Sequence, residues 1–221
     1  EVIRRIAEGG HELGSHSYWH RNVHTLSQED FQEDLKRSIS AIENACGVRV
    51  QSYRAPSFSI TPGCEWAFDV LLDLGIRYDA SLFPAVRIDG GYPCDRAPHV
   101  FNATPSGRGI PELPMSVARI GGRIFGFSGG GYLRLFPLWL IKRKIAALNA
   151  SGVPAVVYLH PRDIAPDCPV APMSYFNRRV LYVGLGSAAD KLRGLLAKFR
   201  FGSCETVLSE QLGEAMQCST S

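Results

Sequence analysis

Several features that define other protein classes are missing from this sequence of 221 residues. Its six cysteines form no CxxC pair and have no regular spacing, which excludes a zinc ribbon and a dense disulfide framework. No unbroken apolar run approaches the roughly 20 residues that a membrane-spanning helix needs. The formal net charge of +3 is too small for a dedicated nucleic-acid binder. What remains is a globular composition with 45% hydrophobic and 20% charged residues.

The cysteines and the first residues bear on the origin of the chain. Isolated cysteines favour free thiols and therefore a reducing, cytoplasmic compartment, although isolated disulfides in a periplasmic protein would give the same pattern. The chain begins without Met, and residues 1–10 have the pattern of a final amphipathic helical turn that glycine ends. We therefore expect that earlier residues of the protein are missing here.

Helical and extended patterns alternate along the first eighty residues. A capping box at Ser27 precedes a helix with one apolar face, which Gly47 ends. Thr61 and Pro62 supply an N-cap and a first turn for the next helix, which Gly75 ends. Short extended segments are expected at residues 11–17, 48–54 and 76–79. This alternation predicts an α/β fold in which βα units surround a parallel sheet or barrel.

The remainder of the chain differs in composition and in its expected elements. Residues 84–131 are rich in glycine and proline, which predicts an insert with short extended pieces and a glycine loop at residues 129–131. A helix is expected over residues 138–148, followed by an apolar strand over residues 154–159. Residues 188–199 predict a last helix, with Ser187 as its N-cap.

Two histidines four residues apart give the clearest chemical signal. His16 and His20 follow an expected strand, so both imidazoles can face one metal ion. A catalytic zinc site also needs a third protein ligand and an open position for water, so two histidines alone are insufficient. Because this spacing is common by chance, surface or hydrogen-bonding roles for both residues stay open.

Three further polar residues follow expected strands. Arg54 opens the sequence RAPS, Asp79 ends the segment at residues 76–79, and His160 closes the apolar run at residues 154–159. In βα barrels the loops at the carboxyl ends of the strands build the active site, so these side chains would converge on one face. Simpler readings stay open: a salt bridge for Arg54, a turn cap for Asp79, and a semi-buried imidazole for His160.

The ordered motifs HSYWH, RAPS, YDASLFP and LHP resemble those of the polysaccharide deacetylase (NodB-homology, carbohydrate esterase 4-like) family. The segment GGGYLRLFP and a C-terminal extension are similar to the subgroup associated with exopolysaccharide clusters. The resemblance implies an irregular (β/α)7-type barrel that here lacks its first strand or strands. It also implies a deacetylase domain at residues 1–165, with an insert at about 84–131, and an extension at residues 166–221 packed on the barrel.

Site residues follow from the same resemblance. His16 and His20 match two ligands of a divalent metal, with Zn²⁺ as the expected ion. Arg54 matches the arginine that pairs with the catalytic base, and His160 matches the catalytic acid. Asp79 matches the fourth motif and is a further catalytic candidate. Each role is carried over from the motif that the residue occupies.

The resemblance also exposes a gap. The motif with the catalytic-base aspartate and an acidic metal ligand should lie ahead of Glu1, and it is absent from this sequence.

Trp19, Ser57 and Tyr132 are candidate substrate-binding residues. The aromatic rings of Trp19 and Tyr132 can stack on a sugar, but both are equally suited to packing.

The expected activity is that of a metal-dependent hydrolase that removes N-acetyl groups from an N-acetylated polysaccharide or glycan. Its partner would be that glycan, with no nucleic acid and no membrane-spanning segment, and the sequence does not indicate an oligomeric state. Two alternatives stay open. One is an inactive, truncated homologue that binds glycan or metal, and the other is an amidohydrolase that acts on a small amide.

Overall fold

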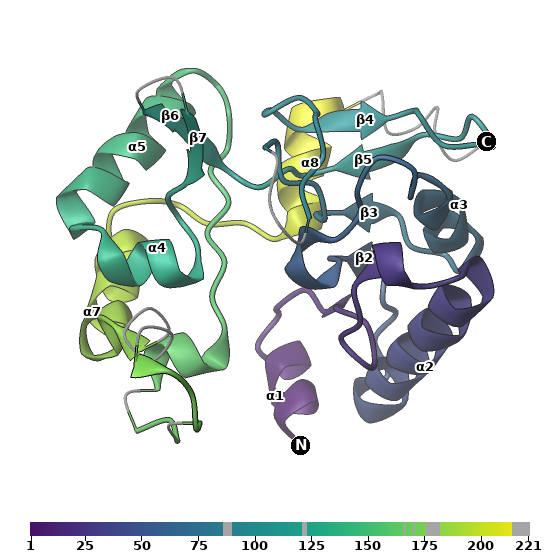
Figure 1. The fold of residues 1–221 in the computed structure, drawn as a ribbon, viewed down its shortest axis with the longest axis horizontal. Helices are drawn as coiled ribbons and strands as arrows, with labels where there is room; N and C mark the ends of the chain where they lie inside the picture. The colour runs from purple at the N-terminus through teal and green to yellow at the C-terminus, as the bar shows by residue number, and fades with distance from the viewer. Residues whose placement is uncertain (86–89, 121–122, 166, 170, 176–181, 214–221) are drawn as a thin grey trace. The chain divides into compact units, whose positions relative to one another are not determined.

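The structure is a computed structural model that describes residues 1–85, 90–120, 123–165, 167–169, 171–175 and 182–213. The chain divides into two compact units (Figure 1). The first unit comprises Glu1–Met115 with Gly202–Ser221, and the second comprises Ser116–Phe201. The domain boundaries expected from the family resemblance are a separate division of the chain, and they stay a prediction.

A five-stranded sheet with the order β1-β2-β3-β5-β4 lies at the centre of the first unit. Four of its strands are parallel: β1 (Gly14–Ser15), β2 (Ser52–Tyr53), β3 (Tyr78–Asp79) and β5 (Ile110–Glu112). The edge strand β4 (His99–Phe101) is antiparallel to β5. The α/β class with a parallel sheet is confirmed, and the sheet is open rather than closed within the described part of this unit.

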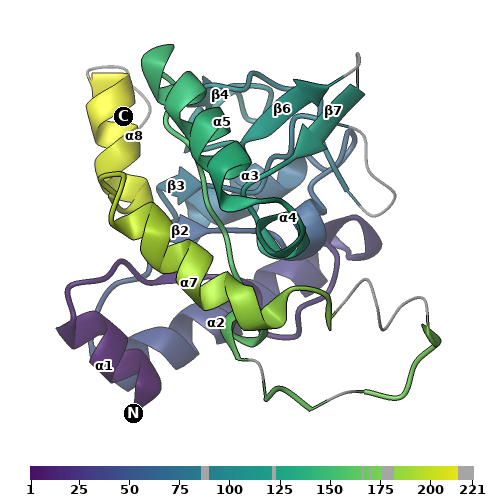
Figure 2. The same cartoon turned by 90° about the vertical axis from the view of Figure 1, so that its left-hand side faces the viewer.

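Helices flank this sheet. They are α1 (Val2–Glu8), α2 (Gln28–Cys46), α3 (Trp66–Asp73) and α8 (Cys204–Leu212), with short 3-10 helices η1 (Val23–Thr25) and η2 (Pro56–Phe58). Figures 1 and 2 show α3 and α8 on opposite sides of β3. Fully buried side chains between these elements form an apolar core that includes Phe31, Leu35, Ile60, Phe68 and Leu71.

The helix α2 forms as its sequence predicts. Ser27 Oγ accepts a hydrogen bond from Asp30 N–H at 3.1 Å, which satisfies one of the unpaired N–H groups of the first turn. Gly47 ends the helix in a left-handed conformation with φ of +73°. Phe31 and Leu35 are buried, so the apolar face is the one that packs on the core.

The start of α3 differs from the sequence prediction. The helix begins at Trp66 with Glu65 at the N-cap position, and not at Thr61 and Pro62. Thr61 O instead accepts a hydrogen bond from Cys64 N–H at 2.9 Å, which closes a separate turn. The prediction was wrong because the Thr-Pro pair is as well suited to starting a turn as to starting a helix.

The second unit combines a hairpin with helices. Strands β6 (Val117–Ile120) and β7 (Arg123–Gly126) pair antiparallel, and they are followed by α4 (Gly130–Leu135), α5 (Leu138–Ala150), η3 (Pro161–Ile164) and α7 (Leu185–Leu196). Phe127, Leu133, Ile141, Ile145 and Leu195 are buried in the core of this unit. The predicted helix at residues 138–148 is confirmed as α5. The glycine loop expected at residues 129–131 is wrong, because α4 begins at Gly130.

The apolar run at residues 154–159 is not a strand of a sheet. Its one β-bridge joins Tyr158 to Gly129. Serine hydroxyls satisfy part of its backbone instead: Val156 N–H donates to Ser116 Oγ at 2.7 Å, and Val156 O accepts from Ser128 Oγ at 2.6 Å. Side-chain hydrogen bonds thus take the place of the ladder that the sequence predicted.

The end of the chain also differs from its prediction. The helix expected over residues 188–199 starts three residues earlier, at Leu185, with Gly184 as the N-cap. Ser187 therefore lies inside the helix, where its hydroxyl donates to Gly184 O at 3.0 Å. It is also not the last helix, because α8 follows it.

Two expectations from composition can be compared with the structure. Cys46, Cys64, Cys94, Cys168 and Cys204 are free thiols, as expected, and Cys218 lies outside the described residues. Among the helices in the described ranges, none combines the length and the apolar character needed to cross a membrane.

Candidate functional site

His16 and His20 lie on the loop that follows β1, at the carboxyl end of the parallel strands. Their ring centroids are 5.0 Å apart, and the rings meet edge to face. Both residues are exposed. The loop turns sharply because Ser17 and His20 adopt left-handed backbone conformations, with φ of +72° and +56°. The structure therefore brings together the two imidazoles that the HSYWH motif indicated as a pair.

A backbone carbonyl orients the His16 imidazole. Nδ1 of His16 lies 2.7 Å from Arg54 O, so this nitrogen carries the hydrogen and donates it to the carbonyl. Metal-bound histidines commonly use one ring nitrogen in this way, which makes the other nitrogen the ligand. The hydrogen bond therefore selects Nε2 of His16 as the atom that would bind a metal ion.

Arg54 follows β2 and reaches toward the end of β3. Its Nε donates to Ala80 O at 2.9 Å, and its guanidinium carbon lies 5.9 Å from the centre of the Phe58 ring. Through its own carbonyl, Arg54 also accepts the hydrogen bond from His16. The residue thus joins the histidine loop to the neighbouring strand ends, on the side of the sheet where the sequence predicted it.

Asp79 is completely buried at the end of β3, and Ser81 binds both of its carboxylate oxygens. The N–H of Ser81 donates to Oδ2 at 2.9 Å, and its hydroxyl donates to Oδ1 at 2.6 Å. Ser81 Oγ also accepts a hydrogen bond from Ala55 N–H at 2.8 Å. Asp79 therefore fixes the backbone beside Arg54 and has no surface exposed to solvent.

Glu112 on β5 lies beside Asp79 and forms a buried carboxyl pair with it. The two residues are register partners of adjacent parallel strands, and neither is exposed. Burial and the charge of Asp79 raise the pKa of Glu112 well above its ordinary value, and burial also raises the pKa of Asp79. The protonated form of Glu112 is therefore favoured in this pair, and its Oε1 accepts a hydrogen bond from Leu82 N–H at 3.0 Å. Arg54 opposes both shifts.

His160 lies in the second unit, directly before η3, with its side chain 52% exposed. Its backbone N–H donates to Asp163 Oδ2 at 2.9 Å, and its Nδ1 lies 3.5 Å from the same oxygen. Asp163 forms a buried ion pair with Arg134, whose Nε is 3.1 Å from Asp163 Oδ1. Within its own unit, His160 is therefore held from one side by a carboxylate that an arginine fixes.

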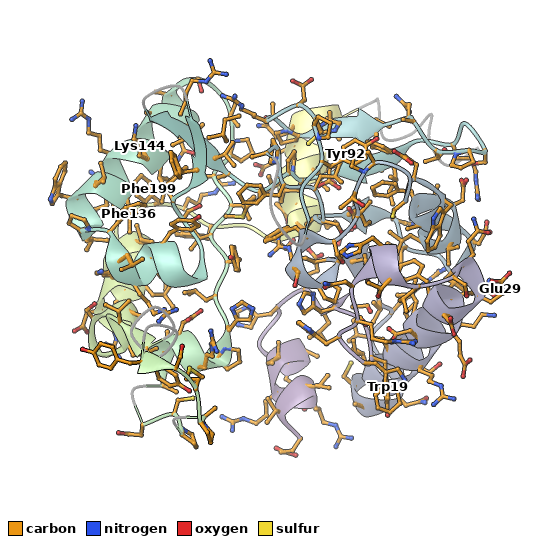
Figure 3. The ribbon with its side chains drawn as sticks, viewed as in Figure 1. Trp19, Glu29, Tyr92, Phe136, Lys144 and Phe199 are labelled. Atoms are coloured by element: carbon orange, nitrogen blue, oxygen red, sulfur yellow. The ribbon has the colours of Figure 1, made fainter. Side chains whose placement is uncertain are left out.

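The three candidate sugar-binding residues lie in different surroundings. Trp19 is 59% exposed and meets Tyr18 edge to face, and Figure 3 shows its side chain at the periphery beside α2. Ser57 is exposed and has a left-handed backbone with φ of +56°. Tyr132 on α4 is half-buried and stacks on Phe136. Of the two aromatic residues, Trp19 is therefore the better placed to offer a ring face to a ligand.

The histidine pair fits two positions of a metal site. Neutral imidazoles are common ligands of Zn²⁺, and the orientation of His16 is the one that metal-bound histidines adopt. In the ranges that the structure describes, no group of three or more His, Cys, Asp or Glu side chains could hold a metal ion together. His16 and His20 would thus supply two ligands, and the described residues bring no third to them.

Three residues near these candidates escaped the sequence analysis. Glu112 stands between apolar residues and prolines, and a lone acid in such a segment is the signal that it is buried with a partner. Asp163 follows His160 by three residues, a spacing that suits a contact in one turn. Arg134 gives no signal in the sequence, because its partner is 29 positions away and lies on a different element.

We expect Glu112→Gln to change the pH dependence of stability. Because its pKa is raised, Glu112 holds its proton to higher pH in the native protein than in the unfolded chain, where the carboxyl group ionises above about pH 4.3. The contribution of Glu112 to the free energy of unfolding is therefore fully present below that pH. It falls as the pH rises toward the raised pKa, by up to about 1.4 kcal/mol per pH unit. Glutamine keeps a donor toward Asp79 and does not ionise, so the variant should gain stability relative to wild type between pH 5 and pH 8.

Urea denaturation at both pH values measures this difference. Glu33→Gln is the matched control, because Glu33 is 64% exposed and pairs with Arg37 at the surface of α2. The control should follow the wild-type pH profile. If the free energies of unfolding of Glu112→Gln and wild type changed in parallel with pH, Glu112 would be ionised in the folded protein.

Asp163→Ala should destabilise the protein by about 3–5 kcal/mol, because it leaves Arg134 buried without its carboxylate. Asp190→Ala is the control: Asp190 pairs with Arg193 at the exposed surface of α7, where loss of the pair costs about 1 kcal/mol or less. Chemical denaturation followed through the tryptophan and tyrosine signals measures both. Equal effects of the two substitutions would contradict the structural role given to Asp163.

Part of the chain is similar to known deacetylases. The chain matches the polysaccharide deacetylase family over residues 1–78. It is 29% identical over 85 residues to a peptidoglycan deacetylase of Helicobacter pylori, which is 37% of this chain and 27% of that protein. It is 34% identical over 65 residues to a chitin deacetylase of Colletotrichum lindemuthianum, which is 29% of this chain and 26% of that protein. The chain thus spans about a quarter of the length of these relatives.

Solved structures show the same fold. A protein of Mycobacterium smegmatis, described as a polysaccharide deacetylase, superimposes with a TM-score of 0.62 at 22% identity, covering 96% of this chain and 67% of its own. The PuuE allantoinase superimposes with a TM-score of 0.61 at 14% identity, covering 96% of this chain and 62% of its own. Residues 80–209, more than half of the chain, match a domain of unknown function, DUF3473. The chain therefore belongs to the polysaccharide deacetylase family of carbohydrate esterase 4 type, in the group that carries the DUF3473 domain.

Proposed function

We propose that the protein is a metal-dependent N-deacetylase that acts on an N-acetylated polysaccharide of exopolysaccharide or cell-wall type. One observation carries the proposal: His16 and His20 lie 5.0 Å apart at the carboxyl end of the sheet, and a backbone carbonyl turns His16 into a metal-binding orientation. The family match supports the reaction, and the relatives named for peptidoglycan and chitin support the substrate class.

Nε2 of His16 and a nitrogen of His20 would hold a divalent ion, with Zn²⁺ best suited to two imidazoles. When bound, such an ion polarises the acetyl carbonyl and makes its bound water more acidic. The hydrogen bond from His16 to Arg54 fixes the angle from which His16 approaches the ion. The acidic ligand and the catalytic base of the family are not assigned to any of the described residues.

His160 would protonate the departing amine. An amine leaving group with a high conjugate-acid pKa must gain a proton as the tetrahedral intermediate collapses. An imidazole can supply that proton near neutral pH, and His160 is exposed with a fixed backbone. Arg54 would pair with the base, and Asp79 would contribute by holding the backbone next to Arg54 through Ser81.

The glycan would be held by surface residues. Trp19, next to the histidine pair in sequence and exposed, would stack on a sugar ring. Ser57 and Tyr132 would add polar contacts through their hydroxyls.

Acetate release from N-acetylated substrates tests the proposed function. The full-length protein would be incubated with chitin oligosaccharides and with peptidoglycan, and acetate would be measured before and after a chelator. Allantoin would be tested in parallel, and its consumption would be measured instead, because it carries no acetyl group. Acetate from a glycan that stops after chelation supports the proposal. Turnover of allantoin alone would identify an amidohydrolase of small amides, and metal or glycan binding without turnover would identify an inactive homologue.

We predict that His16→Ala and His20→Ala each lower metal content markedly, because each removes one of two adjacent imidazole ligands. Elemental analysis of the purified protein measures this. His11→Ala is the matched control, since His11 is exposed and precedes β1, and it should retain the wild-type metal content. Stoichiometric metal in the double variant of His16 and His20 would overturn the assignment.

In the full-length protein, His160→Ala should lower kcat by roughly 10²–10⁴-fold, the usual worth of a positioned acid, while metal content stays unchanged. The loss should be smaller on an activated ester, because its leaving group needs no proton. Steady-state kinetics on a matched N-acetyl and O-acetyl substrate would compare the two. Equal loss on both, or loss of metal, would show that His160 is a ligand or a packing residue.

A further inference from the structure

Asp34 on α2 binds the loop that joins His16 to His20 at three points. Its Oδ2 accepts hydrogen bonds from Ser17 Oγ at 2.6 Å and from Tyr18 N–H at 2.8 Å. Its Oδ1 accepts a hydrogen bond from Trp19 N–H at 3.0 Å. The side chain of Asp34 is only 1% exposed, so it points from the helix into the space beneath this loop.

A carboxylate is well suited to this position. Burial of a charge is costly unless hydrogen bonds replace its lost hydration, and Asp34 receives three of them from the loop. Two of these donors are consecutive backbone N–H groups, which would otherwise need another partner. The contact between Asp34 and the loop is therefore reciprocal, because each side satisfies the buried or unpaired groups of the other.

The loop needs such support because its backbone is strained. Ser17 and His20 both have positive φ values, a conformation that residues other than glycine adopt rarely and at a cost of about 1–3 kcal/mol each. Ser17 Oγ donates to Asp34 and also accepts a hydrogen bond from His20 N–H at 3.1 Å. Through Ser17, Asp34 is linked directly to the backbone of His20.

The two histidines are thus held by different means. His16 is oriented by the carbonyl of Arg54, on β2's side of the loop. The backbone of His20 is held through Ser17 and Asp34, on the side of α2. Removing the carboxylate of Asp34 should therefore displace His20 while the contact of His16 with Arg54 persists.

We propose that Asp34 is a positioning residue of the metal site, which sets the place of His20 relative to His16 without binding the metal itself. The proposal rests on the proposed function, because it takes the two histidines as metal ligands. It adds a residue of α2 whose oxygens are occupied by the loop and which contributes to metal affinity only through His20. Partners that orient metal ligands typically change affinity by about 10–100-fold when they are replaced.

The test is a Zn²⁺ titration of the full-length protein and its Asp34→Asn variant, followed by NMR signals of the two imidazoles. Asparagine keeps the size of the side chain but presents an NH₂ group to at least one loop donor. We expect Asp34→Asn to weaken Zn²⁺ binding by about 10–100-fold. In the wild type, the imidazole signals of His16 and His20 should shift together as Zn²⁺ is added. In Asp34→Asn, the His20 signals should no longer shift together with those of His16, whereas a general loss of structure would disturb both imidazoles alike.

Glu33→Gln is the matched control, because it removes the same charge from the adjacent, exposed position of α2 and should leave the affinity unchanged. If Asp34→Asn does not fold, Ser17→Ala tests the same link, because it removes only the hydroxyl between Asp34 and His20; a weaker site is expected again. Unchanged affinity in a folded Asp34→Asn or Ser17→Ala variant, with His20→Ala weakening the site, would overturn the role of Asp34 alone. Unchanged affinity in His20→Ala would instead overturn the metal site on which the proposal rests.

Discussion

Hydrogen bonds from buried polar side chains hold the carboxyl ends of the central strands together. The parallel strands are two or three residues long, so their ladders supply few backbone hydrogen bonds. Ser81 ties the end of β3 to the backbone after β2, and Glu112 ties β5 to the residues after β3. Ser15 of β1 is tied to Ser38 of α2 by a buried hydroxyl pair at 2.7 Å. These bonds fix the positions at which the loops that carry the candidate site leave the sheet.

This arrangement has an energetic cost that an apolar core would avoid. Asp34, Asp79 and Glu112 are all buried, and buried carboxyl groups are stable only when protonated or fully hydrogen-bonded. The remaining interior of the first unit is aromatic and aliphatic. These buried acids gather where the strands end, beside the candidate site, and not throughout the core.

Local patterns could be predicted from the sequence, whereas long-range pairs could not. The helix α2 carries its own start and stop signals in Ser27 and Gly47, and the histidine pair is visible as a spacing. The strand expected at residues 154–159 failed because serine hydroxyls from other segments satisfy part of its backbone, which no local pattern reveals. Glu112 was missed for the same reason, since its partner Asp79 is brought to it only by strand order. Asp34 was not identified from the sequence, because it stands among several acids of the helix, although it shares the buried face of Phe31 and Leu35.

The two units solve one problem in the same way. An imidazole that must meet a metal ion or a substrate has to remain accessible, so burial cannot fix it in place. Asp34 binds backbone N–H groups between His16 and His20, and Asp163 binds the backbone N–H of His160. In each case a buried carboxylate fixes the main chain while the imidazole stays exposed. Fixing the backbone in advance removes much of the entropy that would otherwise be lost on ligand binding, which is what preorganisation of a site requires.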